Sequence, residues 1–253
     1  MHDLHLETWL REEAAPFVGW DFSHLAGRWH EEQPPWSFEE LARGALTAAR
    51  SAVDLGTGGG ERLARLAEAF PPTMIATEGY RPNVEVARRR LAPLGVSVVE
   101  YESKELIRGP LPFERDSISV VLDRHESYDP TEVARVLEPG GIFLTQQVDS
   151  RNLGDLRERF GVRPSTDVTV QRFSSDLEGA GLQVERAEEW WGVSLFADLG
   201  AVVYYLKSIP WSVPGFSVAT HEPALRSLQL QVDHGETLSF RAGRFLIVAR
   251  KPM

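Results

Sequence analysis

The stretch Ala52-Val53-Asp54-Leu55-Gly56-Thr57-Gly58-Gly59-Gly60-Glu61 decides the fold of this chain. Two apolar residues that suit a strand lead into a turn with four glycines in five positions, and a helical pattern over 62–70 follows at once. This order predicts a strand, a tight turn and a helix. Because glycine has no Cβ, such a turn can take positive φ and approach a ligand closely, and the helix start offers unpaired N–H groups. We therefore expect a ligand on this turn.

The residues around the glycines narrow the class of ligand. A P-loop is excluded, because no Lys-Ser or Lys-Thr pair follows the glycines. Asp54 stands two residues before Gly56, where a carboxylate repels a pyrophosphate and suits a cation. Glu78 lies 24 residues after Asp54, at the end of a predicted strand over 73–77, where it can accept hydrogen bonds from both hydroxyls of a ribose. The spacing of Glu78 alone fits NAD equally well.

The motif from Asp54 to Gly60 resembles the glycine motif of class I S-adenosylmethionine-dependent methyltransferases. Two further signals agree: Glu78 after the second strand, and Arg135-Val136-Leu137-Glu138-Pro139-Gly140-Gly141, which is similar to the Arg-Val-Leu-Lys-Pro-Gly-Gly of that family. The resemblance covers residues 50–149, and 243–252 match the closing strand. It implies an α/β fold with a doubly wound, seven-stranded, mostly parallel sheet whose last strand is antiparallel, and S-adenosyl-L-methionine as the cofactor.

The resemblance also implies which residues bind the cofactor. Two positions depart from the family pattern: Tyr101-Glu102-Ser103 stands where an Asp is usual, and Ile118-Ser119 stands where Phe-Asp is usual. The expected cofactor-binding residues are Asp54, Gly56, Thr57, Gly58, Gly60, Glu78, Gly79, Tyr80, Glu102, Ser103, Asp123 and Arg124.

Candidate catalytic residues follow the fourth predicted strand, over 117–122. In a doubly wound sheet, ligands bind beyond the carboxyl ends of the strands where the strand order reverses, here between the first and fourth strands. His125 and Glu126 form the one adjacent His-Glu pair placed there, so we take them as the catalytic candidates. A histidine hydrogen-bonded for structure is the alternative. In the family that the glycine motif resembles, this position lines the methyl-transfer site. Neither Asn-Pro-Pro-Tyr nor Pro-Cys stands here, so the resemblance disfavours methylation of adenine or glutamine amino groups and cysteine-dependent cytosine chemistry.

Two segments outside the central sheet are expected to cover the site. Residues 1–50 form an N-terminal helical and aromatic segment, and 51–253 form the methyltransferase domain with an apolar insert at 192–236. An antiparallel last strand makes the insert leave and return on the carboxyl edge, so we expect a lid built from 1–40 and the insert. The alternatives are aromatic packing against a sheet edge and a homodimer contact. The expected acceptor-binding residues are Trp20, Arg28, Gln146, Gln147, Tyr204, Tyr205 and Trp211.

The rest of the chain alternates between helical and strand patterns. We expect helices over 37–50, 84–94, 130–137, 173–180, 195–206 and 223–232, and strands over 96–101, 142–148, 182–190 and 244–250.

Composition limits the class of protein. The 253 residues, 42% hydrophobic and 25% charged, describe a soluble globular protein of one domain. No run of about 18 apolar residues and no basic-then-apolar leader occurs, so we expect neither a membrane span nor a signal peptide. The chain has no cysteine, which excludes disulfides and cysteine–zinc sites and fits a cytoplasmic enzyme. The net charge of −10 disfavours nucleic acid as a partner.

We therefore expect a methyltransferase that moves the sulfonium methyl group in line to a small, partly hydrophobic or aromatic acceptor, with no metal. Two alternatives remain open. One is a non-catalytic S-adenosylmethionine-binding regulator or partner subunit, and the more distant one is an NAD-dependent oxidoreductase.

Overall fold

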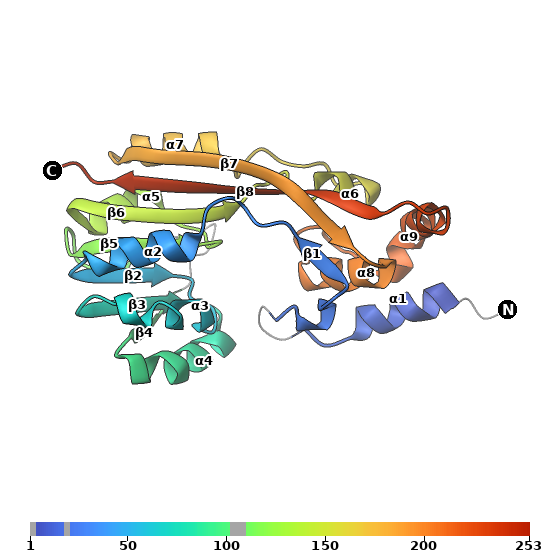
Figure 1. Cartoon of the computed structure of the whole chain (residues 1–253), viewed down its shortest axis with the longest axis horizontal. Coiled ribbons are helices and arrows are strands. Elements are labelled where there is room, and N and C mark those ends of the chain that lie inside the picture. The colour runs from blue at the N-terminus through green and yellow to red at the C-terminus, as the bar shows by residue number, and fades with distance from the viewer. Residues whose placement is uncertain (1–3, 18–20, 102–109) are drawn as a thin grey trace. The chain divides into compact units, whose positions relative to one another are not determined.

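The structure, a computed structural model, describes residues 4–17, 21–101 and 110–253 (Figure 1). The chain forms two compact units, and each is built from separate segments. Unit 1 comprises Met1–Pro34, Ser150–Thr166 and Trp191–Gly243, and unit 2 comprises Pro35–Asp149, Asp167–Trp190 and Arg244–Met253. The glycine-rich turn belongs to unit 2.

The described strands form one sheet in the order β1-β7-β8-β6-β5-β2-β3-β4. Their bounds are β1 Trp29–Glu31, β2 Ser51–Leu55, β3 Thr73–Glu78, β4 Ser97–Glu100, β5 Ile118–Arg124, β6 Leu137–Val148, β7 Gln183–Phe196 and β8 Leu238–Arg250. β2 pairs in parallel with β3 and β5, β3 with β4, and β5 with β6, whereas β8 is antiparallel to β6. The predicted doubly wound, mostly parallel sheet with an antiparallel last strand is therefore confirmed.

The sheet has one strand more than the seven that were predicted. The additional strand is β1, which lies in unit 1 and pairs antiparallel with the end of β7. Its three residues are too few to show the alternation of apolar and polar side chains that marks a strand in a sequence.

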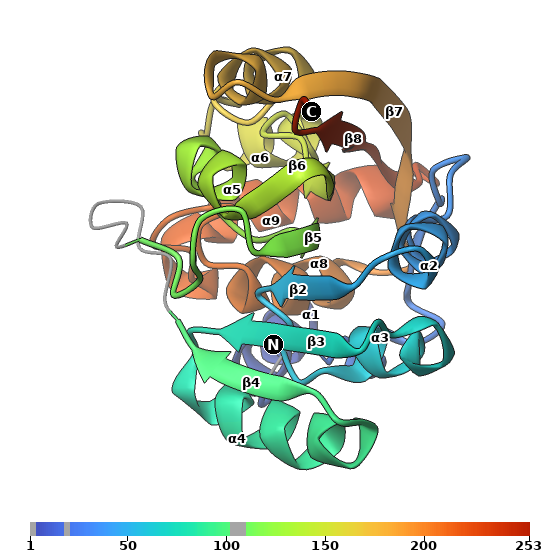
Figure 2. The same cartoon turned by 90° about the vertical axis from the view of Figure 1, so that its left-hand side faces the viewer.

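Helices cover both faces of the sheet in unit 2 (Figure 2). α2 (Phe38–Thr47), α3 (Glu61–Ala64) and α4 (Arg81–Leu91) share a core with alternate residues of the central strands, among them Ala52, Val120, Leu144 and Leu246. α5 (Pro130–Val136) and α7 (Val170–Gly179) pack on the opposite face, against the intervening residues, among them Val53, Val121, Phe143 and Phe245. Covering both faces makes the strands apolar throughout, which is why they were recognisable in the sequence.

Unit 1 has its own core, to which the insert contributes most of the apolar residues. Its helices are α1 (Leu4–Ala14), α6 (Gly154–Arg159), α8 (Leu199–Ser208) and α9 (Val218–Asp233). Buried side chains of α8 and α9 pack there with Trp9, Leu25 and Leu156. This core accounts for the apolar composition of the insert. In the described part of the chain, no helix combines the length and the apolar character that crossing a membrane requires.

The helix predicted over 62–70, directly after the glycines, is wrong in length. α3 has four residues, and a 3₁₀ turn over Ala67–Ala69 follows it. Leu63, Leu66 and Ala69 are all buried in the same core. These three residues are spaced three positions apart. A 3₁₀-helix has three residues per turn, so it keeps side chains with this spacing on one face better than an α-helix does.

Several other boundaries differ from the sequence predictions, because polar caps and strand pairing extend past the apolar patterns. β6, for example, begins at Leu137 instead of 142. β7 continues to Phe196, so the helix predicted from 195 begins at Leu199, where Asp198 caps it by accepting a hydrogen bond from the Ala201 N–H. α9 begins at Val218 under a Ser217 cap, and Pro223, the predicted start, lies inside it after a kink at His221. β8 begins at Leu238 instead of 244.

Candidate functional site

The glycine-rich turn is held against the end of β3 by backbone hydrogen bonds. The N–H of Thr57 donates to the carbonyl oxygen of Thr77 (2.9 Å). The N–H of Gly58 donates to Oε2 of Glu78 (2.6 Å), and the N–H of Tyr80 donates to Oε1 of the same carboxylate (2.7 Å). Each carboxylate oxygen retains capacity for another hydrogen bond. Glu78 therefore fixes the turn and can still accept from a ligand.

The glycines of the turn are needed for two different reasons. Gly56, Gly58 and Gly60 all have φ between +63° and +79°, a region that other residues rarely adopt. A Cβ on Gly56 would lie 2.5 Å from Oε2 of Glu126, and one on Gly60 would lie 2.8 Å from Cγ of Leu91. Among the described residues other than its two chain neighbours, no heavy atom lies within 4 Å of a Cβ placed on Gly58. The backbone at Gly58 is thus the part of the turn that a ligand can approach.

Carboxyl groups gather where β2, β3 and β5 end. The pKa of Asp54 is raised to about 7, mainly by burial and also by the charge of Glu78, while a hydrogen bond with Thr57 and the charge of Arg124 act in the opposite direction. Burial likewise raises the pKa of Glu78, and the charge of Glu126 adds to this effect. Mutual repulsion of this kind is relieved by a cation. The end of the sheet beside the glycine turn therefore favours a positively charged ligand.

Asp123 is fully buried in this group. The hydroxyl of Thr145 and the side-chain amide of Gln147 both donate to its Oδ1, at 3.0 and 2.6 Å. Burial, with the charges of Glu126 and Asp54, raises the pKa of Asp123 well above its usual value. Among the described residues its Oδ2 has no hydrogen-bond partner, and a buried polar atom of this kind is commonly satisfied by a ligand or water.

A chain of hydrogen bonds sets the protonation of His125. The indole N–H of Trp36 donates to Oε1 of Gln146 (2.8 Å), and Nε2 of Gln146 lies 3.3 Å from Nε2 of His125. An indole N–H can only donate, so the amide oxygen faces Trp36 and the NH₂ group faces the imidazole. Nε2 of His125 must then accept, which leaves the ring proton on Nδ1. In this arrangement His125 has a donor, and no free basic nitrogen, to offer a ligand.

The charges around His125 favour the same neutral ring. Burial lowers the pKa of His125, and the guanidinium groups of Arg124, Arg244 and Arg62 lower it well below the usual value. His125 is exposed to solvent, so burial alone does not account for the lowered pKa of its ring, and the cationic neighbours contribute to it. His125 also has φ of +68°, and this sharp turn in the chain precedes Glu126, whose side chain lies over Gly56.

Most of the residues predicted at the cofactor lie in the same compact unit as the glycine-rich turn. Asp54, Gly56, Thr57, Gly58, Gly60, Glu78, Gly79, Tyr80, Asp123, Arg124, His125 and Glu126 all belong to unit 2, as do Gln146 and Gln147. Gln147 also donates to the backbone carbonyl of Glu126 (2.9 Å). Trp20, Glu102 and Ser103 lie outside the described residues.

Four residues with evident roles here were not singled out from the sequence: Trp36, Thr145, Arg62 and Arg244. Trp36 was one of several N-terminal aromatic residues with nothing to distinguish it. Arg244 was visible as the first residue of the last predicted strand, but only the register of β8 against β6 places it near His125.

Arg28, a predicted acceptor-binding residue, belongs to unit 1 and is occupied by ion pairs there. Its Nε and Nη2 bond to Asp198 at 2.8 and 2.6 Å, and Nη1 bonds to Glu12 at 2.7 Å. These two carboxylates account for the charge of Arg28 without a substrate.

Three predicted aromatic acceptor residues also belong to unit 1. Tyr204 and Tyr205 are buried in its core, and the hydroxyl of Tyr204 donates to the carbonyl oxygen of Pro16 (3.0 Å). Trp211 is 63% exposed. A role of these residues toward an acceptor stays a prediction.

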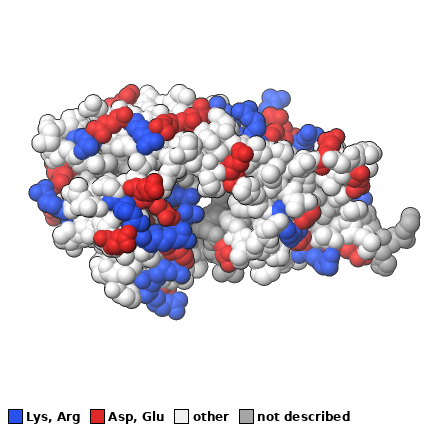
Figure 3. Space-filling view, viewed as in Figure 1, with Lys and Arg blue, Asp and Glu red and all other residues white. Residues whose placement is uncertain are grey.

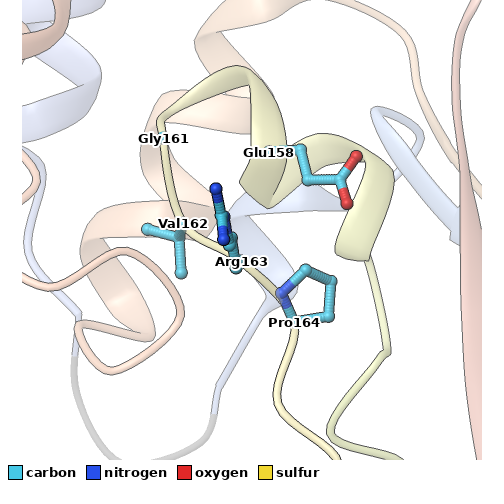
Figure 4. A pocket seen from close by; sticks show the side chains of 5 residues that line it. All are labelled: Glu158, Gly161, Val162, Arg163 and Pro164. Atoms are coloured by element: carbon cyan, nitrogen blue, oxygen red, sulfur yellow. The ribbon is translucent and has the colours of Figure 1, made fainter.

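Two of the surface pockets lie among described residues of unit 1. One, of about 480 Å³, is lined by Glu158, Gly161, Val162, Arg163 and Pro164 (Figure 4) and contains none of the predicted site residues. The other, of about 160 Å³, is lined by Pro16, Asp21, Ser23, His24 and Tyr204. Within 4–17, 21–101 and 110–253, no group of three or more His, Asp or Glu side chains is arranged to hold a metal ion.

Comparison with known sequences gives one informative relative. No protein-family model matches the chain. Trans-aconitate 2-methyltransferase of Methylobacterium radiotolerans is 30% identical over 127 residues, which are 50% of this chain and 48% of that protein. The chain thus matches this curated relative over about half of the relative's length.

Solved structures share the fold over most of the chain. A candidate methyltransferase of Bacillus halodurans superposes with a TM-score of 0.61 at 19% identity, over 86% of this chain and 99% of its own. The YcgJ protein of Bacillus subtilis gives 0.58 at 18% identity, over 85% and 98%. Geranyl diphosphate methyltransferase, solved in complex with S-adenosylmethionine, gives 0.50 at 14% identity, over 84% of each chain. The chain therefore has the Rossmann-like fold of the class I S-adenosylmethionine-dependent methyltransferases, the family that its glycine-rich turn resembles.

Proposed function

We propose that this protein is an S-adenosylmethionine-dependent methyltransferase with a small-molecule acceptor. The observation that carries the proposal is the set of carboxyl groups, Asp54, Glu78, Asp123 and Glu126, whose charges act on one another beside the glycine turn. S-adenosylmethionine carries a cationic sulfonium and an ammonium group, which such a set stabilises. The pyrophosphate of NAD would be repelled by it.

The residues present fit this cofactor. The carboxylate of Glu78 is fixed by the N–H groups of Gly58 and Tyr80 and has oxygens left for two ribose hydroxyls. Gly58 leaves open space for close approach, and Oδ2 of Asp123 lacks a partner that a ligand would supply. We assign Thr57, Gly79 and the exposed Tyr80 to the surrounding contacts. When bound, the cofactor would supply the methyl group on its sulfonium.

We assign His125 an orienting role toward the acceptor. Its Nε2 is engaged by Gln146, so Nδ1–H is the group that can hold an acceptor oxygen. Positioning can lower a barrier by about 7–11 kcal/mol, whereas a general base contributes about 10²–10⁴-fold in rate. An in-line displacement therefore does not require a base here. Glu126, packed over Gly56, would lie near the positive charge of the sulfonium, which is lost when the methyl group is transferred.

The acceptor and the lid remain proposals. We keep a small acceptor with a hydrophobic or aromatic part, and a lid formed by residues 1–40 and 192–236. The apolar side chains of α8 and α9 serve the core of unit 1, so they support an apolar acceptor less directly than the sequence suggested. A homodimer and a cytoplasmic location stay predictions.

The proposal is tested by incubating the protein with S-adenosylmethionine labelled in the methyl group and a panel of small acceptors. Labelled product together with S-adenosylhomocysteine supports it. Tight binding of the cofactor with no transfer to any acceptor would favour a non-catalytic binding protein, and binding of NAD in its place would favour an oxidoreductase.

A further inference from the structure

Two buried polar side chains, Trp36 and Gln146, lie beside His125 in unit 2. Trp36 is 8% exposed and Gln146 is 5% exposed. The indole N–H of Trp36 donates to Oε1 of Gln146 at 2.8 Å. Gln146 follows Leu144 by two residues on β6, and Leu144 shares a core with Trp36 and with residues of α2. Side chains two residues apart on a strand share a face, so Gln146 lies on the face that α2 covers.

The charged groups of the covering helices lie outside this core. Figure 3 shows basic and acidic side chains mixed over the surface of α2 and α3, where Glu39 lies 3.5 Å from both Arg62 and Arg65. Trp36, by contrast, is surrounded by apolar side chains. A pair of hydrogen-bonded groups in a core can be replaced by apolar groups of the same shape at little or no cost in stability. The stability of the core therefore does not require this hydrogen bond.

Gln146 is joined to His125 in two places. The backbone N–H of His125 donates to the backbone carbonyl of Gln146 at 2.9 Å. Nε2 of the Gln146 amide lies 3.3 Å from Nε2 of the imidazole. Because Trp36 occupies the amide oxygen, the NH₂ group is the part of the amide that faces the ring. Within the described part of the chain, no group accepts a hydrogen bond from Nδ1 of His125, so Nδ1–H is free for a ligand.

The direction of this chain of hydrogen bonds depends on the indole donor. Without the Trp36 N–H, the amide of Gln146 could turn over and present its oxygen to His125. Nε2 of the ring would then carry the proton, and Nδ1 would be left as an acceptor. A ring with Nδ1–H binds an atom that has a lone pair, whereas the other tautomer binds an N–H or O–H group. Trp36 therefore determines which kind of atom His125 can hold.

We propose that Trp36 and Gln146 are positioning residues that fix His125 in its Nδ1–H tautomer, so that the site selects methyl acceptors that present a hydrogen-bond-accepting atom to this ring. The proposal rests on the methyltransferase function proposed above and adds the residues that set the choice of acceptor. A carbonyl or ether oxygen or an unprotonated aromatic nitrogen meets the requirement. A group with only N–H donors does not, because a site that donates a hydrogen bond rejects an analogue that cannot accept it.

The tautomer is tested by the nitrogen chemical shifts of isotope-labelled histidine at about pH 8, where an ordinary imidazole is neutral. His125→Gly assigns the signals by their loss. We expect Nδ1 to be protonated and Nε2 unprotonated in the wild type. Trp36→Phe removes the donor and should give a mixture of the two tautomers. Gln146→Glu presents a carboxylate that accepts from both Trp36 and the ring, so the proton should move to Nε2.

Trp190→Phe is the matched control. Trp190 packs against the same core as Trp36, and among the described residues its indole N–H has no hydrogen-bond partner. The substitution therefore removes an indole from this core without removing a hydrogen bond to Gln146. The tautomer of His125 should stay as in the wild type.

The selection is tested with pyridine and pyrrole, two flat rings of similar size, in the presence of S-adenosylhomocysteine. Pyridine only accepts a hydrogen bond through its nitrogen, and pyrrole only donates one. Titrations followed by the nitrogen signals of His125 should show that the wild type and Trp190→Phe bind pyridine about tenfold more tightly than pyrrole, as expected for one hydrogen bond. Gln146→Glu should reverse this preference.

Three results would overturn the proposal. These are a wild-type His125 with its proton on Nε2, a tautomer that neither Trp36→Phe nor Gln146→Glu changes, and a wild type that does not prefer pyridine, whether it binds both probes equally or neither. If Trp36→Phe does not fold, Gln146→Glu decides, because it keeps the hydrogen bond from Trp36. If the tautomer and the preference change as expected but the protein binds no S-adenosylmethionine, the proposed function fails while the positioning of His125 stands. Methyl transfer by a wild type with the opposite tautomer would refute the positioning and leave the function.

Discussion

The N–H of Gly58 donates to the carboxylate of Glu78 at 2.6 Å, so the residue that should hold the ribose also holds the turn that should approach the cofactor. The other oxygen of Glu78 accepts from the N–H of Tyr80 at 2.7 Å. Both bonds are charge-assisted. The first joins the turn after β2 to the end of β3, and the second lies within the loop that follows β3. The geometry of the turn and its affinity for ligand are therefore coupled through one side chain.

Glu78→Ala and Glu78→Gln should both weaken S-adenosylmethionine binding. Alanine removes the acceptor for two N–H groups and for the ribose, at a cost of about 1–3 kcal/mol. Glutamine has a single acceptor oxygen, so one of the two N–H groups would face an NH₂ group. Calorimetric titration should show at least a tenfold loss for each variant. Glu85→Gln, on exposed α4, is the matched control and should bind like the wild type; unchanged affinity in both Glu78 variants would remove this residue from the site.

Gly56→Ala should be poorly tolerated. The new Cβ would lie 2.5 Å from Oε2 of Glu126, and φ is +63°, so both the contact and the backbone are strained. Strain of this kind costs about 1–3 kcal/mol. Gly44→Ala, in α2 with open space around it, is the control and should stabilise the helix by about 0.5–1 kcal/mol. Urea unfolding measures both changes, and equal effects of the two substitutions would contradict the packing of Glu126 over Gly56.

Asp54 should make the free energy of unfolding depend on pH. Its pKa is raised to about 7 in the folded protein, whereas an unfolded Asp has a pKa of about 3.9. The folded state therefore binds this proton more tightly, and stability is lost as the pH rises from about 4 to about 7. The loss is at most about 4 kcal/mol, and partial exposure of the side chain makes it smaller.

Asp54→Asn should flatten this dependence, whereas Asp176→Asn, which changes an exposed carboxylate of α7, should not. Cofactor binding has the opposite trend in the wild type, because a cation prefers ionised Asp54. Affinity for S-adenosylmethionine should therefore increase as the pH rises through about 7. Parallel pH profiles for the wild type and Asp54→Asn, in both stability and affinity, would show that Asp54 does not titrate in this range.

His125 should be neutral with its proton on Nδ1 at neutral pH. Nitrogen chemical shifts of the imidazole report the tautomer directly. The pH profile of the rate should then show no rising limb from this ring near pH 6.5. His125→Gly accepts the φ of +68° without strain and His125→Ala does not, so the glycine variant isolates the side chain. A rising limb in the wild-type profile, together with a loss of about 10²–10⁴-fold in kcat in His125→Gly that added imidazole partly restores, would identify a general base instead.

The sequence predicted those parts of the fold that depend on local patterns. The glycine turn, the apolar central strands and the start of α2 near Ser37 each depend on a few neighbouring residues. The strand β1 and the shortness of α3 could not be predicted, because each depends on pairing or packing with distant residues.

The candidate site likewise contains residues that local sequence patterns identify and residues that they do not. Asp54, Glu78 and Asp123 could be placed because each ends a strand beside the point where the strand order reverses. The roles of Trp36 and Arg244 depend on side-chain contact and on strand register, which no local pattern records. For Tyr204 and Tyr205, by contrast, the local pattern predicted a role that the structure does not show. Their apolar surroundings predicted a binding surface, and the structure uses them in the core of unit 1.

The most direct test of the central claim is a calorimetric titration of the purified protein with S-adenosylmethionine and, separately, with NAD. The four carboxyl groups beside the glycine turn predict binding of S-adenosylmethionine that is at least tenfold weaker in Glu78→Ala, and no binding of NAD. Binding of NAD without binding of S-adenosylmethionine would contradict the account, whatever acceptor is later found.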